Sequence, residues 1–226
     1  MFLCITLQPI ILTIMTTPLE TRNEHLANHL IKQLKKRNME AVYCPTAQQA
    51  IEKVKEMIPA GASVTWGGSM TLRDMGLTRA LHEADLYQLY DRDLAQSAEE
   101  AQEIYRKAFS ADFYLSSANA LSEDGIIVNI DGNGNRVAAI TFGPKHVIFV
   151  ISLHKVAQTV ETALARARST AAPVNAARFD ISTPCRIDGI CHNCNSPQSI
   201  CNCIHLLRNS KPGRVTVILM AEEYGY

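Results

Sequence analysis

Five of the seven cysteines in this sequence lie close together near its C-terminal end. Cys185, Cys191, Cys194, Cys201 and Cys203 fall within 19 residues, and Asp, Asn, Ser, Gly and Pro fill much of the gaps between them. A segment of that composition favours neither helix nor strand, so it can wrap several thiolates around one centre. Compact four-cysteine loops hold iron–sulfur clusters, whereas structural zinc usually uses two cysteine pairs separated by a longer insert.

The spacing therefore favours an iron–sulfur cluster, such as a 4Fe–4S cluster, with zinc as the alternative and a disulfide or unmodified thiols as a third reading. The expected metal ligands are Cys185, Cys191, Cys194 and Cys201. Cys203 or His192 would then be a spare ligand, or would lie around the four ligands without binding the metal.

Cysteine usage also indicates the compartment. A secreted disulfide scaffold is usually short and cysteine-dense throughout. Here a long region with only Cys4 and Cys44 precedes the cysteine-rich segment. That distribution predicts a cytoplasmic protein, in which clustered thiols bind metal.

A second group of candidate residues is the glycine loop Gly67-Gly68-Ser69. It follows an expected strand and precedes an expected helix, so its backbone N–H groups can converge on an anion, and Ser69 can cap the helix and donate to a phosphate or carboxylate. A plain strand-to-helix turn with a serine cap explains the same residues.

Two further turns carry charged side chains. Glu123 stands before Asp124-Gly125 and could act as a nucleophile or general base, although acids beside such turns are usually only solvated. Gly134, Asn135 and Arg136 form the other turn, where the guanidinium offers a planar fork to a carboxylate or phosphate. A hairpin accounts for the glycines, and a lone arginine is usually solvated.

Hydrophobic periodicity and capping signals predict the elements that position these groups. Alternating strands and helices predict an α/β fold with a mixed, mainly parallel sheet covered by helices on both faces, followed by the cysteine-rich loop. Because turns converge beyond the carboxyl ends of the strands of such a sheet, Ser69, Glu123 and Arg136 are expected to face one cleft that binds a small anion. The expected helices are 19–37, 47–58, 70–75, 97–109 and 156–167, and the expected strands are 41–44, 63–66, 86–90, 113–115, 126–130, 137–142, 147–151 and 215–220, with a hairpin turn at 131–134.

Composition narrows the class of partner. Lys+Arg and Asp+Glu are equal at 22 each among 226 residues, and no basic run stands out, so neither nucleic acid nor an anionic membrane is an expected partner.

Residues 1–14 hold no charge, are too short to span a bilayer and lack the features of a secretory signal. They are expected to be a dispensable extension, or else an extra strand or oligomer contact, while 15–226 form one domain that includes the metal loop at 183–203.

Taken in order, several motifs resemble the LUD-domain family, which is associated with lactate utilisation. They are residues 67–72, 119–125, 134–137 and 143–144, and the segments 183–201 and 214–226 are similar to a cysteine-bearing branch of that family.

The resemblance implies a fold like those of ribose-5-phosphate isomerase, glucosamine-6-phosphate deaminase and CoA transferases (NagB/RpiA/CoA-transferase-like). Gly67-Gly68-Ser69 resembles the phosphate-binding loop of that fold, and Ser122-Glu123-Asp124-Gly125 is similar to the CoA-transferase motif in which glutamate forms a thioester.

Three functions follow as hypotheses. The leading one is a LUD-domain protein linked to lactate or related organic-acid utilisation, with an iron–sulfur or other metal centre for electron transfer or assembly. Other subunits of a lactate-oxidation system are its expected partners. The second is an enzyme acting on a phosphorylated or CoA-linked small molecule, with Glu123 catalytic and a structural metal. The third is a ligand-binding regulator with structural zinc.

Overall fold

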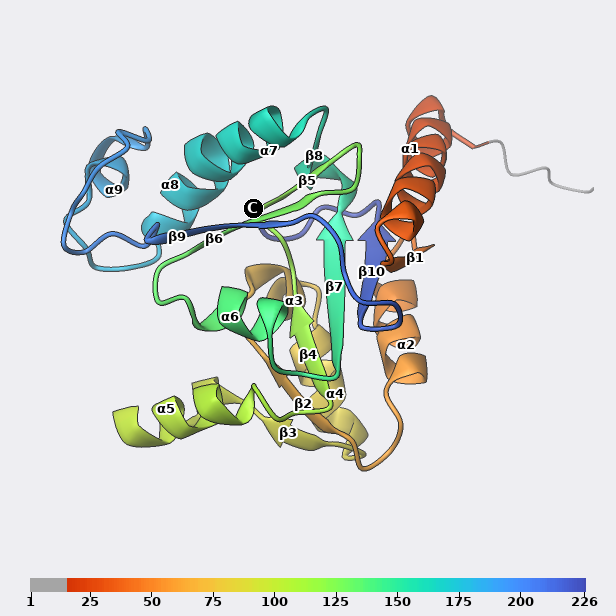
Figure 1. Cartoon of the computed structure of the whole chain (residues 1–226), viewed down its shortest axis with the longest axis horizontal. Helices are drawn as coiled ribbons and strands as arrows, with labels where there is room; N and C mark the ends of the chain where they lie inside the picture. Colours follow the sequence, from red (N-terminus) through yellow and green to blue (C-terminus); the bar gives the residue numbers. More distant parts are fainter. Residues whose placement is uncertain (1–15) are drawn as a thin grey trace, which may run out of the picture.

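The computed structural model describes residues 16–226, which form two sheets with helices packed against them (Figure 1). The larger sheet has six strands in the order β1-β10-β7-β4-β2-β3, and all neighbouring strands are parallel. These strands are β1 (Glu40–Tyr43), β2 (Ser63–Trp66), β3 (Gln88–Tyr90), β4 (Phe113–Ser116), β7 (His146–Ser152) and β10 (Val215–Met220).

Apolar side chains on both faces of this sheet form two cores, as expected for buried parallel strands. In β7, Val147 and Phe149 belong to one core and Ile148 and Val150 to the other, because side chains alternate along a strand. The first core is covered by α1 (Pro18–Lys36) and α6 (Asn135–Thr141), and the second by α2 (Ala47–Met57), α3 (Met70–Asp74) and α4 (Leu77–Ala84). Helix α5 (Ala98–Lys107) precedes β4.

The smaller sheet has the strand order β8-β5-β6-β9 and contains the antiparallel pairs. One of its faces packs on α7 (Val160–Arg166), and residues of the other face join the core under α1. Its strands are β5 (Ala120–Ser122), β6 (Ile127–Asp131), β8 (Val156–Ala157) and β9 (Cys203–Leu207).

A π-helical turn, Ala167–Ala171, joins α7 to α8 (Ala172–Ala176). Pro173 has no N–H to donate to the preceding turn, which accounts for the wider winding just before it. The short helix α9 (Pro184–Asp188) then opens the cysteine-rich segment.

The predicted α/β class with a mainly parallel sheet is confirmed, and β2 and β10 have the predicted bounds. The capping box before α2 is also confirmed, because Thr46 Oγ1 accepts from Gln49 N and Thr46 N donates back to Gln49 Oε1. The expected extension, residues 1–14, lies outside the described residues. Within 16–226, no helix is long and apolar enough to cross a membrane.

The predicted hairpin at residues 131–134 and the strand after it are wrong, because residues 135–141 form helix α6. The carboxylate of Asp131 accepts four backbone N–H groups, those of Asn133, Gly134, Arg136 and Val137, each at 3.1 Å. It thereby supplies acceptors that the first turn of a helix otherwise lacks. The helix predicted over 156–167 begins later, at Val160, since Val156 and Ala157 pair with β5.

Candidate functional site

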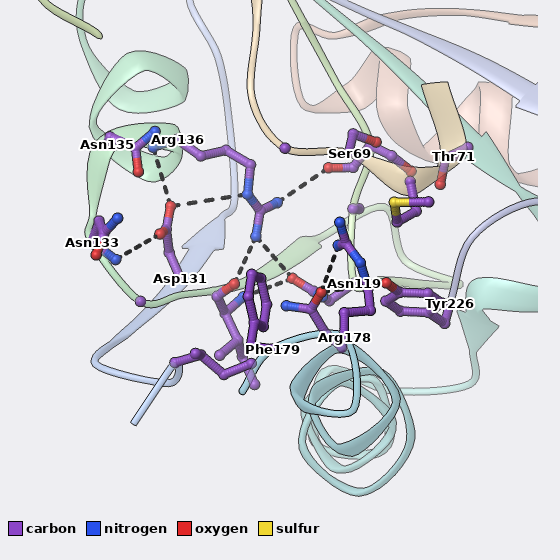
Figure 2. A pocket seen from close by; sticks show the side chains of 18 of the residues that line it. Ser69, Thr71, Asn119, Asp131, Asn133, Asn135, Arg136, Arg178, Phe179 and Tyr226 are labelled. Carbon is purple, nitrogen blue, oxygen red and sulfur yellow. Dashed lines mark hydrogen bonds and ion pairs between the residues drawn. The ribbon is translucent and has the colours of Figure 1, made fainter. Parts of the chain in front are cut away.

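A pocket with a cavity of about 350 Å³ lies beyond the carboxyl ends of the parallel strands (Figure 2). Ser69 follows β2, Ser117 and Asn119 follow β4, and Lys155 follows β7, so strands from the middle of the sheet deliver these side chains to one place. Ligands of open α/β sheets gather at this edge. The structure thus brings together polar groups that lie up to about 90 residues apart in the sequence.

The charges lining the pocket are strongly unequal. The guanidinium groups of Arg92, Arg136 and Arg178 and the amine of Lys155 face it, whereas Asp131 is the one carboxylate side chain among the described residues that line it. Asp131 is only 8 % exposed, and its oxygens are already occupied by the backbone N–H groups of the α6 turn. The balance therefore favours an anionic ligand.

Arg136 is held by the protein itself. Its Nη1 donates to Asn129 Oδ1 at 2.6 Å and to the Ser117 carbonyl at 3.3 Å. Its Nη2 donates to the Ile130 carbonyl at 2.6 Å and to Asn119 Oδ1 at 3.1 Å. Burial lowers the pKa of this guanidinium, while the nearby Asp131 carboxylate raises it. Arg136 thus joins β6 to the segment after β4 and fixes the shape of the pocket wall.

Lys155 is a pocket residue that the sequence analysis did not identify. It is 1 % exposed, and its Nζ donates to Thr71 Oγ1 at 2.7 Å and to Ser117 Oγ at 3.3 Å. Burial, and then the charges of Arg166 and Arg136, lower the pKa of its amine to about 7. The available signal was its place directly after the apolar run of β7, a position that faces ligands in this kind of sheet.

The opposite wall comes from the end of α8 and the segments beyond it. Arg178 Nη1 donates to Asn175 Oδ1 at 2.9 Å, the Tyr226 hydroxyl donates to the same oxygen at 3.3 Å, and the Arg178 guanidinium lies 5.4 Å from the centre of the Phe179 ring. Arg178, Phe179 and Tyr226 appear together in Figure 2. Arg178 is exposed at the pocket rim, so it remains accessible to an entering anion.

Among the predicted ligand-binding residues, Gly68, Ser69, Asn135 and Arg136 line this pocket. Ser69 also caps α3, its hydroxyl accepting from Leu72 N. Two glycines are not lining residues. Gly67 packs behind the wall, where an added Cβ would lie 2.8 Å from Tyr114 Oη, and Gly134 takes a left-handed φ of 78° just before α6.

The expectation that Glu123 shares this cleft is wrong. Asn119, which lines the pocket, precedes β5, whereas Glu123 follows that strand and therefore lies beyond its other end. There the Glu123 carbonyl contacts His29 Nε2 at 3.0 Å, and Asp124 pairs with Arg37 at 2.7 Å. The turn therefore contacts α1, because β5 runs away from the pocket before the turn and β6 runs back toward the pocket after it.

The cysteine-rich segment borders the same pocket. Ile181, just before it, and Ile200, within it, are lining residues, and Asn202 Nδ2 donates to the Gly132 carbonyl at 2.9 Å. Burial, and then negative charge on Cys185, Cys191 and Cys194, raise the pKa of the Cys201 thiol to about 11. The four predicted ligands are therefore electrostatic neighbours.

Polar groups contact two of these sulfurs. Arg168 Nη2 lies 4.0 Å from Cys191 Sγ, and Thr183 Oγ1 lies 3.6 Å from Cys185 Sγ. None of the six cysteines in the described part of the chain forms a disulfide. Within residues 16–226, no three His, Cys, Asp or Glu side chains are arranged to hold a metal ion, so the metal site stays a prediction.

Comparisons with known proteins agree with this fold. A crystal structure of a DUF162 family protein from Deinococcus radiodurans is similar, with a TM-score of 0.52 and 14% identity, covering 88% of this chain and 98% of that one. The eIF2B delta structure from Chaetomium thermophilum gives a TM-score of only 0.33 at 17% identity, covering 62% of this chain and 54% of that one. No curated protein sequence matches.

The family model for the LUD domain matches residues 27–220, which include both sheets and the cysteine-rich segment. The chain belongs to the LUD-domain family, which supports a role related to lactate utilisation.

Proposed function

We propose that this protein binds lactate or a related small organic acid in the pocket beyond the sheet, and that its cysteine loop holds an iron–sulfur centre for electron transfer or assembly. The observation that carries the proposal is the charge of the pocket. Arg92, Lys155 and Arg178 face the cavity, and its one carboxylate, Asp131, is taken up by backbone N–H groups and lies beside Arg136.

Neutral donors and acceptors complete the ligand site. Hydroxyls from Ser69, Thr71 and Ser117 and amides from Asn119 and Asn135 line the same cavity. A short hydroxy acid presents one carboxylate and one hydroxyl group, and a cationic pocket with several polar side chains can satisfy both. This chemistry supports an organic acid as the ligand.

The donor set of the cysteine loop fits an iron–sulfur cluster. The Cys201 thiol interacts electrostatically with those of Cys185, Cys191 and Cys194, and N–H and O–H groups contact two of these sulfurs, as is common around such clusters. A cluster bound there would accept and pass on single electrons. Because Ile181 and Ile200 line the acid pocket, we propose that the two sites act together, with other subunits of a lactate-oxidation system as electron partners.

The metal proposal is tested by elemental analysis of anaerobically purified protein. Iron and acid-labile sulfide should be present together with broad visible absorption. Cys194→Ser should lower the iron content sharply. Cys44→Ser should leave the iron content unchanged, because Cys44 is buried in the core covered by α2, α3 and α4. Protein that holds zinc in place of iron would support a ligand-binding regulator with structural zinc.

The ligand proposal is tested by titrating L-lactate and pyruvate into the protein. Arg178→Gln should weaken binding about 10- to 150-fold, because one charge-assisted hydrogen bond contributes about 1.5–3 kcal/mol. Arg79→Gln is the matched control, since that side chain is 79% exposed on α4 and does not line the pocket. Equal affinities of the two variants would count against the pocket as the binding site.

A further inference from the structure

Lys155 has surroundings that are unusual for a buried lysine. Two of the three protons of its ammonium form would point to neutral hydroxyls, those of Thr71 and Ser117. Among the described residues, no carboxylate forms an ion pair with it. Buried lysines are almost always paired with an opposite charge, so this position favours the neutral amine until an anion arrives.

The charged groups around Lys155 act in the same direction. Arg166 on α7 and Arg136 on α6 disfavour a second positive charge, and only Asp74 at the end of α3 favours it. The rim residue Arg178 adds a further positive charge to the same cavity. The fixed positive charges around Lys155 therefore disfavour its protonated form.

The other titratable groups near Lys155 change little between pH 6 and 8. Burial and the charge of Lys155 lower the pKa of His154 to about 4, and burial raises the pKa of Tyr226 above its ordinary value. Arg136 and Arg166 stay protonated, because even a lowered guanidinium pKa lies far above neutrality. Lys155 is thus the group in this pocket whose charge can respond to a ligand at neutral pH.

We propose that the pocket binds a small carboxylate together with one proton, and that Lys155 is the residue that takes up this proton. This inference rests on the proposed organic-acid function. It adds that Lys155 takes up the proton and that one proton is bound with each ligand. The balance is simple: a carboxylate, a proton from solvent and the neutral amine give an ammonium–carboxylate pair, and no other bond is made or broken.

The physical reason is mutual stabilisation of opposite charges in a site that excludes water. A carboxylate within about 4–6 Å raises the pKa of an amine by about 1–3 units. Above the amine pKa of the unliganded protein, about 7, each further pH unit should weaken binding about tenfold, until the pH reaches the amine pKa of the complex. Binding is therefore tighter at pH 6 than at pH 8.

The test is calorimetric titration of the full chain with L-lactate, D-lactate, pyruvate and glycolate at constant ionic strength. At each pH, two buffers with different ionisation enthalpies are used, because the difference in heat counts the protons exchanged with buffer. For an amine pKa near 7 that rises by about 1–3 units in the complex, about 0.4–0.9 proton should be taken up per ligand at pH 8 and about 0.1 at pH 6. The affinity should fall about 5- to 10-fold between pH 6 and pH 8.

Two substitutions assign the proton to Lys155. Lys155→Arg keeps the charge at all pH values, and Lys155→Met removes it, so both should abolish proton uptake and flatten the pH dependence. Lys53→Met is the control, since Lys53 lies on α2 and pairs with Glu56 away from the pocket. If neither Lys155 variant folds, as judged by circular dichroism, the two-buffer measurement on the unaltered protein decides alone.

The outcomes separate this inference from the function on which it rests. Binding without proton uptake at pH 8 overturns the role of Lys155 and leaves the organic-acid pocket standing. Uptake that persists in Lys155→Arg assigns the proton to another group and also overturns it. No binding of any of the four acids at either pH refutes the proposed function and the inference together.

Discussion

Replacing Arg136 by methionine should destabilise the fold rather than merely weaken ligand binding. The guanidinium makes four hydrogen bonds to two separate segments, β6 and the chain after β4, and its side chain is only 17% exposed. Methionine fills a similar volume but leaves those four oxygens, and the Asp131 carboxylate, without their cation.

The expected loss follows from that geometry. Hydrogen bonds to a charged group contribute about 1.5–3 kcal/mol each, but they are not additive, and water can satisfy part of what is left. Removing one partner of a buried charged pair costs about 3–5 kcal/mol, which we take as the expected loss in free energy of unfolding. If the free energy of unfolding falls by about 2 kcal/mol per M of urea, the urea concentration at the midpoint of unfolding should fall by about 1.5–2.5 M.

Two further variants serve as comparisons for this measurement. Arg136→Lys should restore little, because one ammonium cannot reach four acceptors that are arranged for a planar fork. Arg79→Met should change the free energy of unfolding by less than about 0.5 kcal/mol, since its contact with Glu83 is long, at 3.8 Å, and exposed. A loss below about 1 kcal/mol for Arg136→Met would refute the structural role argued for this residue.

Three other changes have defined expected outcomes. Thr46→Ala removes the cap of α2 and should lower the free energy of unfolding by about 0.5–2 kcal/mol in urea melts. Gly67→Ala places a Cβ 2.8 Å from Tyr114 Oη and should cost about 1–3 kcal/mol by the same assay. Hydrogen bonds from Lys145, and then from Ser63, hold the pKa of Asp112 well below its ordinary value, so its contribution is full above about pH 4 and is lost as the pH falls. The stability difference between the native protein and Asp112→Asn should therefore narrow from pH 5 to pH 2, and an unchanged difference would contradict this assignment.

The pocket and the cysteine-rich segment form one region of the molecule. Ile181 and Ile200 connect them, and Arg168 lies on the same helical run that leads to the pocket residues Asn175 and Arg178. A ligand that contacts Asn175 and Arg178 would therefore touch the end of the same helical run that carries Arg168. This arrangement is the structural basis for proposing that acid binding and the metal centre are coupled.

Local sequence signals determined most of the secondary structure. Apolar runs bounded by turn residues predicted β2 and β10 with their observed bounds, and the Thr46 capping box predicted the start of α2. The motifs at residues 67–72 and 183–201 pointed to the family that the LUD-domain model then matched. Such signals are reliable because hydrophobic period and caps depend on neighbours within a few residues.

One local signal misled. The run Asp131-Gly132-Asn133-Gly134 has the composition of a hairpin turn, but Asp131 directs its carboxylate to the N–H groups that follow, and a helix forms. Both outcomes suit the same residue types, so the choice depends on packing. Val137 and Ile140 are buried in α6, and that burial favours the helix.

Tertiary structure alone decided which residues meet. The order β1-β10-β7-β4-β2-β3 places the ends of β2, β4 and β7 side by side, and so brings Ser69, Asn119 and Lys155 to one pocket. The same topology turns Glu123 toward α1, at the far end of β5. Strand order arises from contacts between segments far apart in the chain, and no local pattern encodes it. The sequence therefore identified the kinds of residue that could bind a ligand, and the packing of the sheets selected which of them share a site.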